Sequence, residues 1–107
     1  MTTFDERQRG EEKKFQHDQE LMFRARNRRN KLFGLWVATE HLKLPEAEQA
    51  EYAKAVVMAD FEKPGDDDVI AKVKGDLDAK GITISAHILE KHLKELEALA
   101  REQIMAE

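Results

Sequence analysis

The chain changes character at the run NRRNKLFGLW, from Asn27 to Trp36, and this change limits what it can fold into. Upstream, residues 1–19 carry nine charged side chains and only three sizeable apolar ones. Such a segment buries too little apolar surface to offset the entropy lost when it becomes ordered. Downstream, apolar residues recur at the spacing of amphipathic helices. We therefore predict an N-terminal arm, residues 1–19, attached to a helical domain, residues 20–107.

Four segments are predicted to be helical, and the breaks between them fall at turn-forming residues. The first helix is the longest and ends near Lys43, the second runs from Pro45 to about Glu62, the third from Asp66 to Ala79 and the fourth from Ser85 to Met105. Asp66, Asp67 and Asp68 are expected to supply an N-cap and first-turn negative charge, and Ser85 is expected to cap the fourth helix. The predicted fold is all-α: a four-helix bundle with a long first helix and a flexible or marginally helical N-terminal arm.

The apolar stripes of these helices predict which residues form the core. The expected core positions of the first helix are Met22, Phe23, Leu32, Phe33, Trp36 and Val37; those of the second are Ala53, Val56, Val57, Asp60 and Phe61. Those of the third are Val69, Ile70, Val73 and Leu77; those of the fourth are Ile88, Leu89, Leu93, Leu96, Leu99, Ala100 and Ile104.

Two arginines of the first helix, Arg26 and Arg29, fall on its apolar half, where a charge needs a partner. In an antiparallel pair of helices joined near Leu44, Arg29 faces Asp60, the one acid on the apolar stripe of the second helix. We predict an Arg29–Asp60 pair that fixes this hairpin. The alternative is two independently solvated charges.

The arm contains features of a helix that forms against a partner. Thr3 followed three residues later by Glu6 matches a capping box. Phe4 and Phe15 fall within about 20° of each other on a helix of 3.6 residues per turn. Gly10 between them costs about 1 kcal/mol relative to Ala. A helix of this kind is marginal alone and is expected to fold on binding.

Composition excludes several classes of protein. The chain has 107 residues and no cysteine, which leaves no disulfide or thiolate metal site. Its start lacks a secretory signal, and its longest apolar run, Leu32 to Ala38, is far shorter than the ~20 residues of a membrane helix. We expect a soluble intracellular protein with no direct membrane insertion.

Charge is distributed unevenly along the chain. Residues 1–31 hold nine Lys/Arg against six Asp/Glu, whereas the remainder holds nine against sixteen. A basic junction without acids consists of Arg24, Arg26, Arg28, Arg29 and Lys31. This pattern indicates docking onto a partner of mixed or negative charge, although a solvated helix face would look the same.

The sequence contains no recognisable catalytic or metal-binding motif. His87 and His92 diverge by about 140° on a helix, and His17 and His41 lie far apart on the first helix. His92 is expected at the edge of the core rather than in a metal site. No phosphate-binding glycine loop or nucleophile motif occurs, so we predict no enzyme activity, no metal and no cofactor.

An ordered set of motifs covers nearly the whole chain: TTFDERQRGEEKKFQHD, the junction NRRNKLFGLW, Tyr52-Ala53-Lys54, Val56-Val57, Ala59-Asp60-Phe61 and the ending AREQI. In this order they resemble the zeta-type inhibitor subunit of alphaproteobacterial F-type ATP synthases. The resemblance implies inhibition of ATP hydrolysis through insertion of the N-terminal region at a catalytic alpha/beta interface near the central stalk. It also implies a cytoplasmic protein held at the inner membrane by the ATP synthase.

The resemblance also assigns roles to residues and partners. The inserted segment would be Phe4 to Phe15, while the four-helix domain docks outside. The implied partners are the alpha, beta and gamma subunits of the catalytic head, and the implied partner-binding residues are Phe4, Arg7, Arg9, Glu12, Lys13, Lys14 and Phe15.

Two other functions fit the same sequence. The chain could be a small helical adaptor that uses the bundle alone, in which case deletion of the arm would leave its activity intact. It could be a weak nucleic-acid-binding protein that uses the basic junction from Arg24 to Lys31. The acidic total and the absence of a helix-turn-helix or aromatic RNA platform argue against the second, and no DNA binding is expected.

The sparse apolar content of the arm generates a first prediction about the free protein. Amides from about Leu21 to Met105 should be protected from hydrogen exchange, while those of residues 1–19 should exchange quickly because little buried surface stabilises them. Exchange measured by nuclear magnetic resonance checks this. Protection of Arg7 to Glu12 equal to that of Val56 or Leu96 would mean that the arm belongs to the core.

Overall fold

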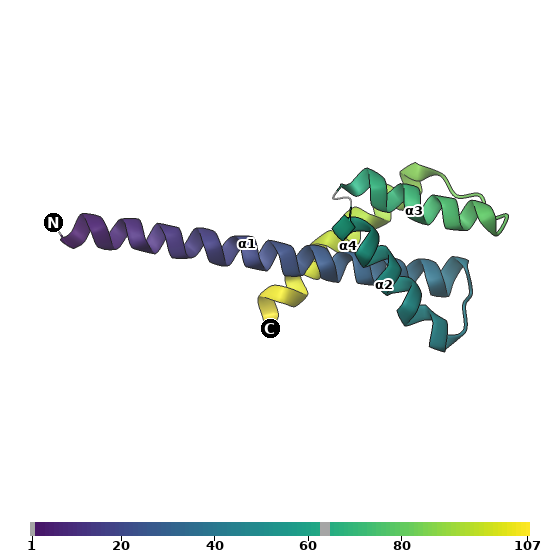
Figure 1. Ribbon diagram of the computed structural model, residues 1–107, viewed down its shortest axis with the longest axis horizontal. Helices are drawn as coiled ribbons and strands as arrows, with labels where there is room; N and C mark the ends of the chain where they lie inside the picture. Colours follow the sequence, from purple (N-terminus) through teal and green to yellow (C-terminus); the bar gives the residue numbers. More distant parts are fainter. Residues whose placement is uncertain (1, 63–64) are drawn as a thin grey trace.

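Helices account for almost all of the chain in the computed structural model, which describes residues 2–62 and 65–107, with side chains from Gln19 onward. The elements are α1 (Thr2–Trp36), a π-helical turn (Val37–His41), α2 (Glu46–Glu62), α3 (Asp66–Ala79) and α4 (Ala86–Ala106). Figure 1 shows these helices in place. They confirm the predicted all-α fold of four helices with a long first helix.

Helix α1 is the longest element of the molecule. Its C-terminal half packs against α2 and α4, and α3 packs against both of these helices. Figure 1 shows the N-terminal half of α1 extending away from the other three helices. The molecule is therefore long and narrow, measuring 66 × 25 × 22 Å along its principal axes. The segment predicted to be an arm forms this extension.

The C-terminal end of α1 differs from the predicted single helix that ends near Lys43. The α-helix ends at Trp36 and widens into the π-helical turn, in which the Leu42 amide donates to the Val37 carbonyl at 2.9 Å. Lys43 then adopts a φ of 51°, in the left-handed region, and the Leu44 amide donates back to the Ala38 carbonyl. The left-handed residue reverses the chain and ends the helix.

The two C-terminal helices begin and end close to the predicted residues. The N-cap of α3 is Gly65, without a side-chain cap, so the predicted capping role of Asp66 is wrong; all three aspartates lie in the first turn. In the first turn, their negative charges interact favourably with the positive end of the helix dipole. Gly81, with a φ of 74°, ends α3 in a Schellman motif closed by the Ile82 amide and the Leu77 carbonyl. The Ser85 hydroxyl accepts from the Ile88 amide at 3.3 Å, as predicted.

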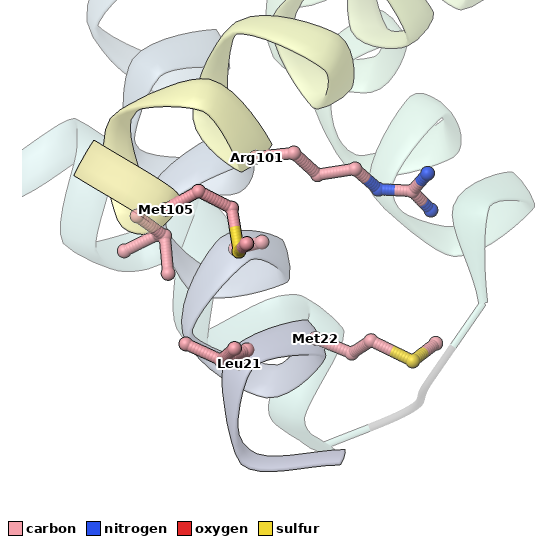
Figure 2. A pocket seen from close by; sticks show the side chains of 6 residues that line it. Leu21, Met22, Arg101 and Met105 are labelled. Carbon is pink, nitrogen blue, oxygen red and sulfur yellow. The ribbon is translucent and has the colours of Figure 1, made fainter. Parts of the chain in front are cut away.

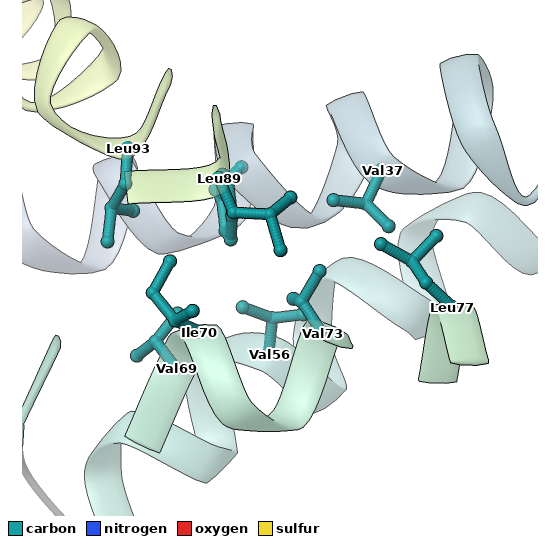
Figure 3. Close-up of a cluster of buried hydrophobic side chains, with 9 residues drawn as sticks. Val37, Val56, Val69, Ile70, Val73, Leu77, Leu89 and Leu93 are labelled. Carbon is teal, nitrogen blue, oxygen red and sulfur yellow. The ribbon is translucent and has the colours of Figure 1, made fainter. Parts of the chain in front are cut away.

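The hydrophobic core lies between the C-terminal half of α1 and the other three helices (Figure 3). All four predicted positions of α3 are buried. The core residues are Phe33, Val37, Val56, Val69, Ile70, Val73, Leu77, Leu89 and Leu93.

Several predicted core residues lie on the surface instead. Met22 and Phe23 are 62% and 54% exposed, and Phe61, Ile88 and Leu99 are also exposed. Met22 and Phe23 precede the point on α1 that the last residues of α2 reach, so α2 does not cover them. Helical periodicity gave the correct face of α1 but not the length over which a neighbouring helix covers it.

Helices α1 and α2 pack closely against each other at Gly34. A Cβ atom at this position would lie 2.7 Å from the Ala53 Cα and 3.2 Å from the Val56 Cγ2. Only a residue without a side chain allows the two backbones to come this close. The contact of Gly34 with Ala53 lies within about one residue of the antiparallel register predicted from a turn near Leu44.

We therefore expect Gly34→Ala to destabilise the bundle by about 1–3 kcal/mol, because the new methyl group forces α1 and α2 apart. Gly75→Ala is the matched control, since a Cβ there meets nothing within 4 Å. In the middle of α3 this change should be neutral or stabilising by up to about 1 kcal/mol. Urea unfolding followed by circular dichroism measures both. Equal stability of the two variants would contradict the close packing at Gly34.

Candidate functional site

The junction between the extended part of α1 and the bundle is built around a buried carboxylate. Arg26 of α1 donates from Nε to Asp60 Oδ2 at 2.6 Å and from Nη2 to Asp60 Oδ1 at 2.8 Å. Asp60, on α2, is only 5% exposed. It also accepts from Asn30 Nδ2 at 2.7 Å and from the Gly65 amide at 3.3 Å. Planar two-point pairing of this kind fixes the orientation as well as the distance of the two helices.

The charge of Asp60 depends on these partners. Burial by itself raises the pKa of its carboxyl, but the hydrogen bonds from Arg26, Asn30 and the Gly65 amide, with the charge of Arg26, outweigh it. The pKa of Asp60 is thereby held below its ordinary value of 3.8. The hydrogen bond to Asp60, together with the charges of Asp60 and Asp66, raises the pKa of Arg26 against the opposing effect of burial. Both groups are charged in the folded protein at neutral pH.

Arg29 does not pair directly with Asp60, and this prediction is wrong. Its Nη1 donates to Asp66 Oδ1 at 2.9 Å, and its Nε and Nη2 donate to Asn30 Oδ1 at 3.1 and 2.8 Å. Arg26 and Asn30 lie four residues apart and share the face of α1 that meets Asp60. Arg29 is turned by about 100° from Asn30, which directs it toward the start of α3.

Asn30 is the residue that sequence reasoning missed. It is fully buried, and its amide accepts from Arg29 while donating to Asp60, so it links the two charges that were predicted to meet. Its position four residues after Arg26, on the half of α1 that faces the core, is the signal that could have identified it.

The other basic junction residues have different environments. Arg28 donates to Gln103 Oε1 at 3.0 Å and to Glu107 Oε1 at 2.6 Å, which ties α1 to the C-terminal end of the chain. Arg24 and Lys31 are exposed, and within the described part of the chain Arg24 contacts Glu20 of its own helix at 3.5 Å.

Three of the five basic junction residues thus bind acidic or amide groups of the bundle: Arg26, Arg28 and Arg29. Their charges are compensated within the fold, which leaves little of the basic junction for phosphate contacts. The nucleic-acid-binding alternative loses its main support.

An apolar groove lies where α1 leaves the bundle (Figure 2), and we call it the arm-root groove. It has a volume of about 350 Å³. Figure 2 shows Leu21 and Met22 of α1 on one side, with Arg101 and Met105 of α4 on the other. Its lining residues are Leu21, Met22, Ala25, Arg101, Ile104 and Met105.

An aromatic cluster lies at the opposite end of the bundle. The ring of Trp36 stacks on His92, with centroids 3.8 Å apart, and lies nearly perpendicular to the ring of His41, with centroids 4.6 Å apart. His92 Nδ1 lies 3.5 Å from Glu95 Oε2, which places His92 at the core edge as predicted. Among the described side chains, no group of three or more histidines or acids is arranged to hold a metal ion. The side chain of His17 lies outside the description.

The residues predicted to bind the partner lie outside the described side chains. They are Phe4, Arg7, Arg9, Glu12, Lys13, Lys14 and Phe15. The backbone at these positions is part of α1. None of the helices in the described part of the chain is long and apolar enough to cross a membrane.

One comparison with known proteins gives a match. The family model described as ATPase inhibitor subunit zeta matches residues 1–103, which is nearly the whole chain and includes the arm. No curated protein and no solved structure gives a match. The family agrees with the resemblance found in the sequence, and its members are regulators rather than enzymes.

The buried carboxylate generates a prediction about stability. Asp60→Asn should lower the free energy of unfolding at pH 7 by about 2–4 kcal/mol, because the part-buried Arg26 loses its charged acceptor and the buried Asn30 amide loses an acceptor oxygen. Glu97→Gln is the matched control, since it removes only the exposed 3.4 Å contact with Arg101. That change should cost less than about 0.5 kcal/mol.

The same pair of variants checks the pH dependence. Folding lowers the pKa of Asp60 below its ordinary value of 3.8, so the stability that the ionised carboxylate contributes is fully present above that value. This stability is lost as the pH falls from 3.8 through the lower pKa of the folded protein. The difference between wild type and Asp60→Asn should therefore shrink below about pH 4. A difference that stays constant from pH 7 to pH 3 would contradict the ionised pair.

Proposed function

Because the chain belongs to the ATPase inhibitor subunit zeta family, we propose that it stops ATP hydrolysis by inserting its N-terminal arm, residues 1–19, into the catalytic head of the F-type ATP synthase. The observation that carries the proposal is the family match over residues 1–103, which spans the arm as well as the bundle. Family membership implies binding to ATP synthase. The route of insertion is our proposal.

The site of insertion is proposed to be a catalytic alpha/beta interface next to the gamma subunit. ATP hydrolysis requires such an interface to open and close in each cycle, and a helix held within it prevents closure. The extension of α1 away from the bundle supports this mode of action, because it gives the arm access to a cleft that the bundle itself could not enter (Figure 1).

The two parts of the chain have separate roles in this proposal. The arm supplies the inserted helix, with Phe4 and Phe15 on one face and Arg7, Arg9, Glu12, Lys13 and Lys14 as polar contacts to the partner. The bundle, residues 20–107, remains outside and holds α1 through the Arg26–Asp60 and Arg28–Glu107 pairs. Since both pairs lie at the root of the arm, they set the direction in which the arm leaves the bundle.

The place of action follows from the partner. The catalytic head of a bacterial ATP synthase lies on the cytoplasmic side of the inner membrane. We propose that the chain is cytoplasmic and is associated with this membrane only through the ATP synthase.

The proposal predicts that the purified chain slows ATP hydrolysis by the catalytic head from its own source, and that removal of residues 1–19 abolishes this effect. Burial of one Phe contributes about 1.5–3 kcal/mol. Phe4→Ala and Phe15→Ala should therefore each weaken inhibition by roughly tenfold or more. Steady-state hydrolysis measured against inhibitor concentration gives the half-inhibiting concentrations.

The chain offers a matched control in Phe61→Ala. Phe61 is 65% exposed and belongs to α2, so its loss should leave inhibition unchanged. Circular dichroism establishes that each variant and the truncated chain remain folded. Inhibition by a folded truncated chain at the wild-type concentration would show that the bundle, and not the arm, carries the activity.

A further inference from the structure

We infer that the inhibitory contact does not end at the arm but continues onto the arm-root groove, which receives an amphipathic helix of the ATP synthase head that carries apolar side chains and a carboxylate. This inference rests on the proposed function, because it extends the interface of the arm. It assigns a docking role to Met22, Met105 and Arg101, residues of the bundle that the inserted-arm mechanism does not use.

Continuity along α1 is the first argument. The helix is unbroken from Thr2 to Trp36, so the arm and the groove lie on one rod. On a helix of 3.6 residues per turn, positions 4, 15 and 22 fall within about 20° of one another. A surface that follows the face of α1 defined by positions 4 and 15 therefore reaches Met22 without any change in the direction of α1.

The exposure of the groove is the second argument. Met22 and Met105 are 62% and 71% exposed, although both are apolar and both line one concave surface. Methionine side chains are flexible and adapt to the shape of an apolar partner. Exposed apolar surface gathered in a concave site typically marks a contact with another protein.

Charge identifies the partner further. Arg101 lines the groove and is 64% exposed at its side chain, and among the described side chains it contacts Glu97 of its own helix at 3.4 Å. Such an exposed pair contributes little to stability, so Arg101 can exchange Glu97 for another carboxylate at small cost. An acidic residue beside the apolar side chains of the partner helix meets this requirement.

The size of the groove suits a small contact. A volume of about 350 Å³ accommodates a few side chains of one helix. A small contact of this kind adds usefully to the arm, because two linked contacts bind more tightly than either alone.

The test uses the full-length chain and the catalytic head from its own source. The double variant Met22→Gln/Met105→Gln should inhibit about tenfold more weakly than wild type, because two apolar contacts are lost. Arg101→Glu should weaken inhibition more than Arg101→Gln, since it places a negative charge against the carboxylate. Met58→Gln is the matched control, because Met58 is an exposed methionine of α2 outside the groove.

The outcomes separate this inference from the proposed function. If the double variant inhibits like wild type while Phe4→Ala is weak, the groove inference is wrong and the inserted arm stands. If Phe4→Ala and Phe15→Ala inhibit like wild type and the double variant is weak, the inserted arm is wrong, and the groove is a contact of its own rather than a continuation of the arm. If the double variant changes only the self-association of the free chain, measured by sedimentation, the groove binds a second copy and the inference is overturned. Unchanged melting temperatures exclude unfolding as the cause of any effect.

Discussion

The pairing of Arg26 with Asp60 is the interaction on which the rest of the structure depends. It joins α1 to both α2 and α3, because Asp60 of α2 also accepts from the amide of Gly65, the N-cap residue of α3. A purely apolar contact at this point would allow α1 to slide or turn relative to α2. Directional hydrogen bonds from Arg26 and Asn30 allow one register only, and the close approach at Gly34 enforces the same register two turns later.

Most residues of the basic junction stabilise the bundle through contacts within the chain. Arg26, Arg28 and Arg29 each reach a different part of the bundle: the end of α2, the end of α4 and the start of α3. The arginine-rich sequence that could have indicated nucleic-acid binding is thus a set of cross-links around one section of α1. A cluster of charged residues in a sequence indicates that these residues bind groups of opposite charge. Here most of those groups belong to the same chain.

The sequence predicted the parts of the fold that depend on local chemistry. The bounds of α3 and the cap of α4 follow from Pro64-Gly65, Gly81 and Ser85, which act within a few residues. Two features depend on long-range geometry and were predicted incorrectly. The partner of Asp60 depends on the rotation of α1 about its own axis, because adjacent side chains on a helix point about 100° apart. The sequence pattern therefore indicated Arg29, whereas Arg26 and Asn30 are the side chains that bind Asp60. The exposure of Met22 and Phe23 depends on where α2 ends relative to α1, and periodicity along one helix does not contain that information.

Of the candidate site, the sequence identified the basic junction and the arm but not the arm-root groove, which forms only when the last turns of α4 reach Leu21 and Met22.

Helix α1 runs without a break from the arm into the bundle. The arm and the bundle share a single helical phase, so the length of the segment between residues 19 and 26 sets their relative rotation. One inserted residue would turn the arm by about 100° and advance it by about 1.5 Å, while seven would nearly restore the original phase. Substitutions in this segment therefore leave the orientation of the arm unchanged, whereas insertions and deletions preserve it only when they are close to a whole number of turns.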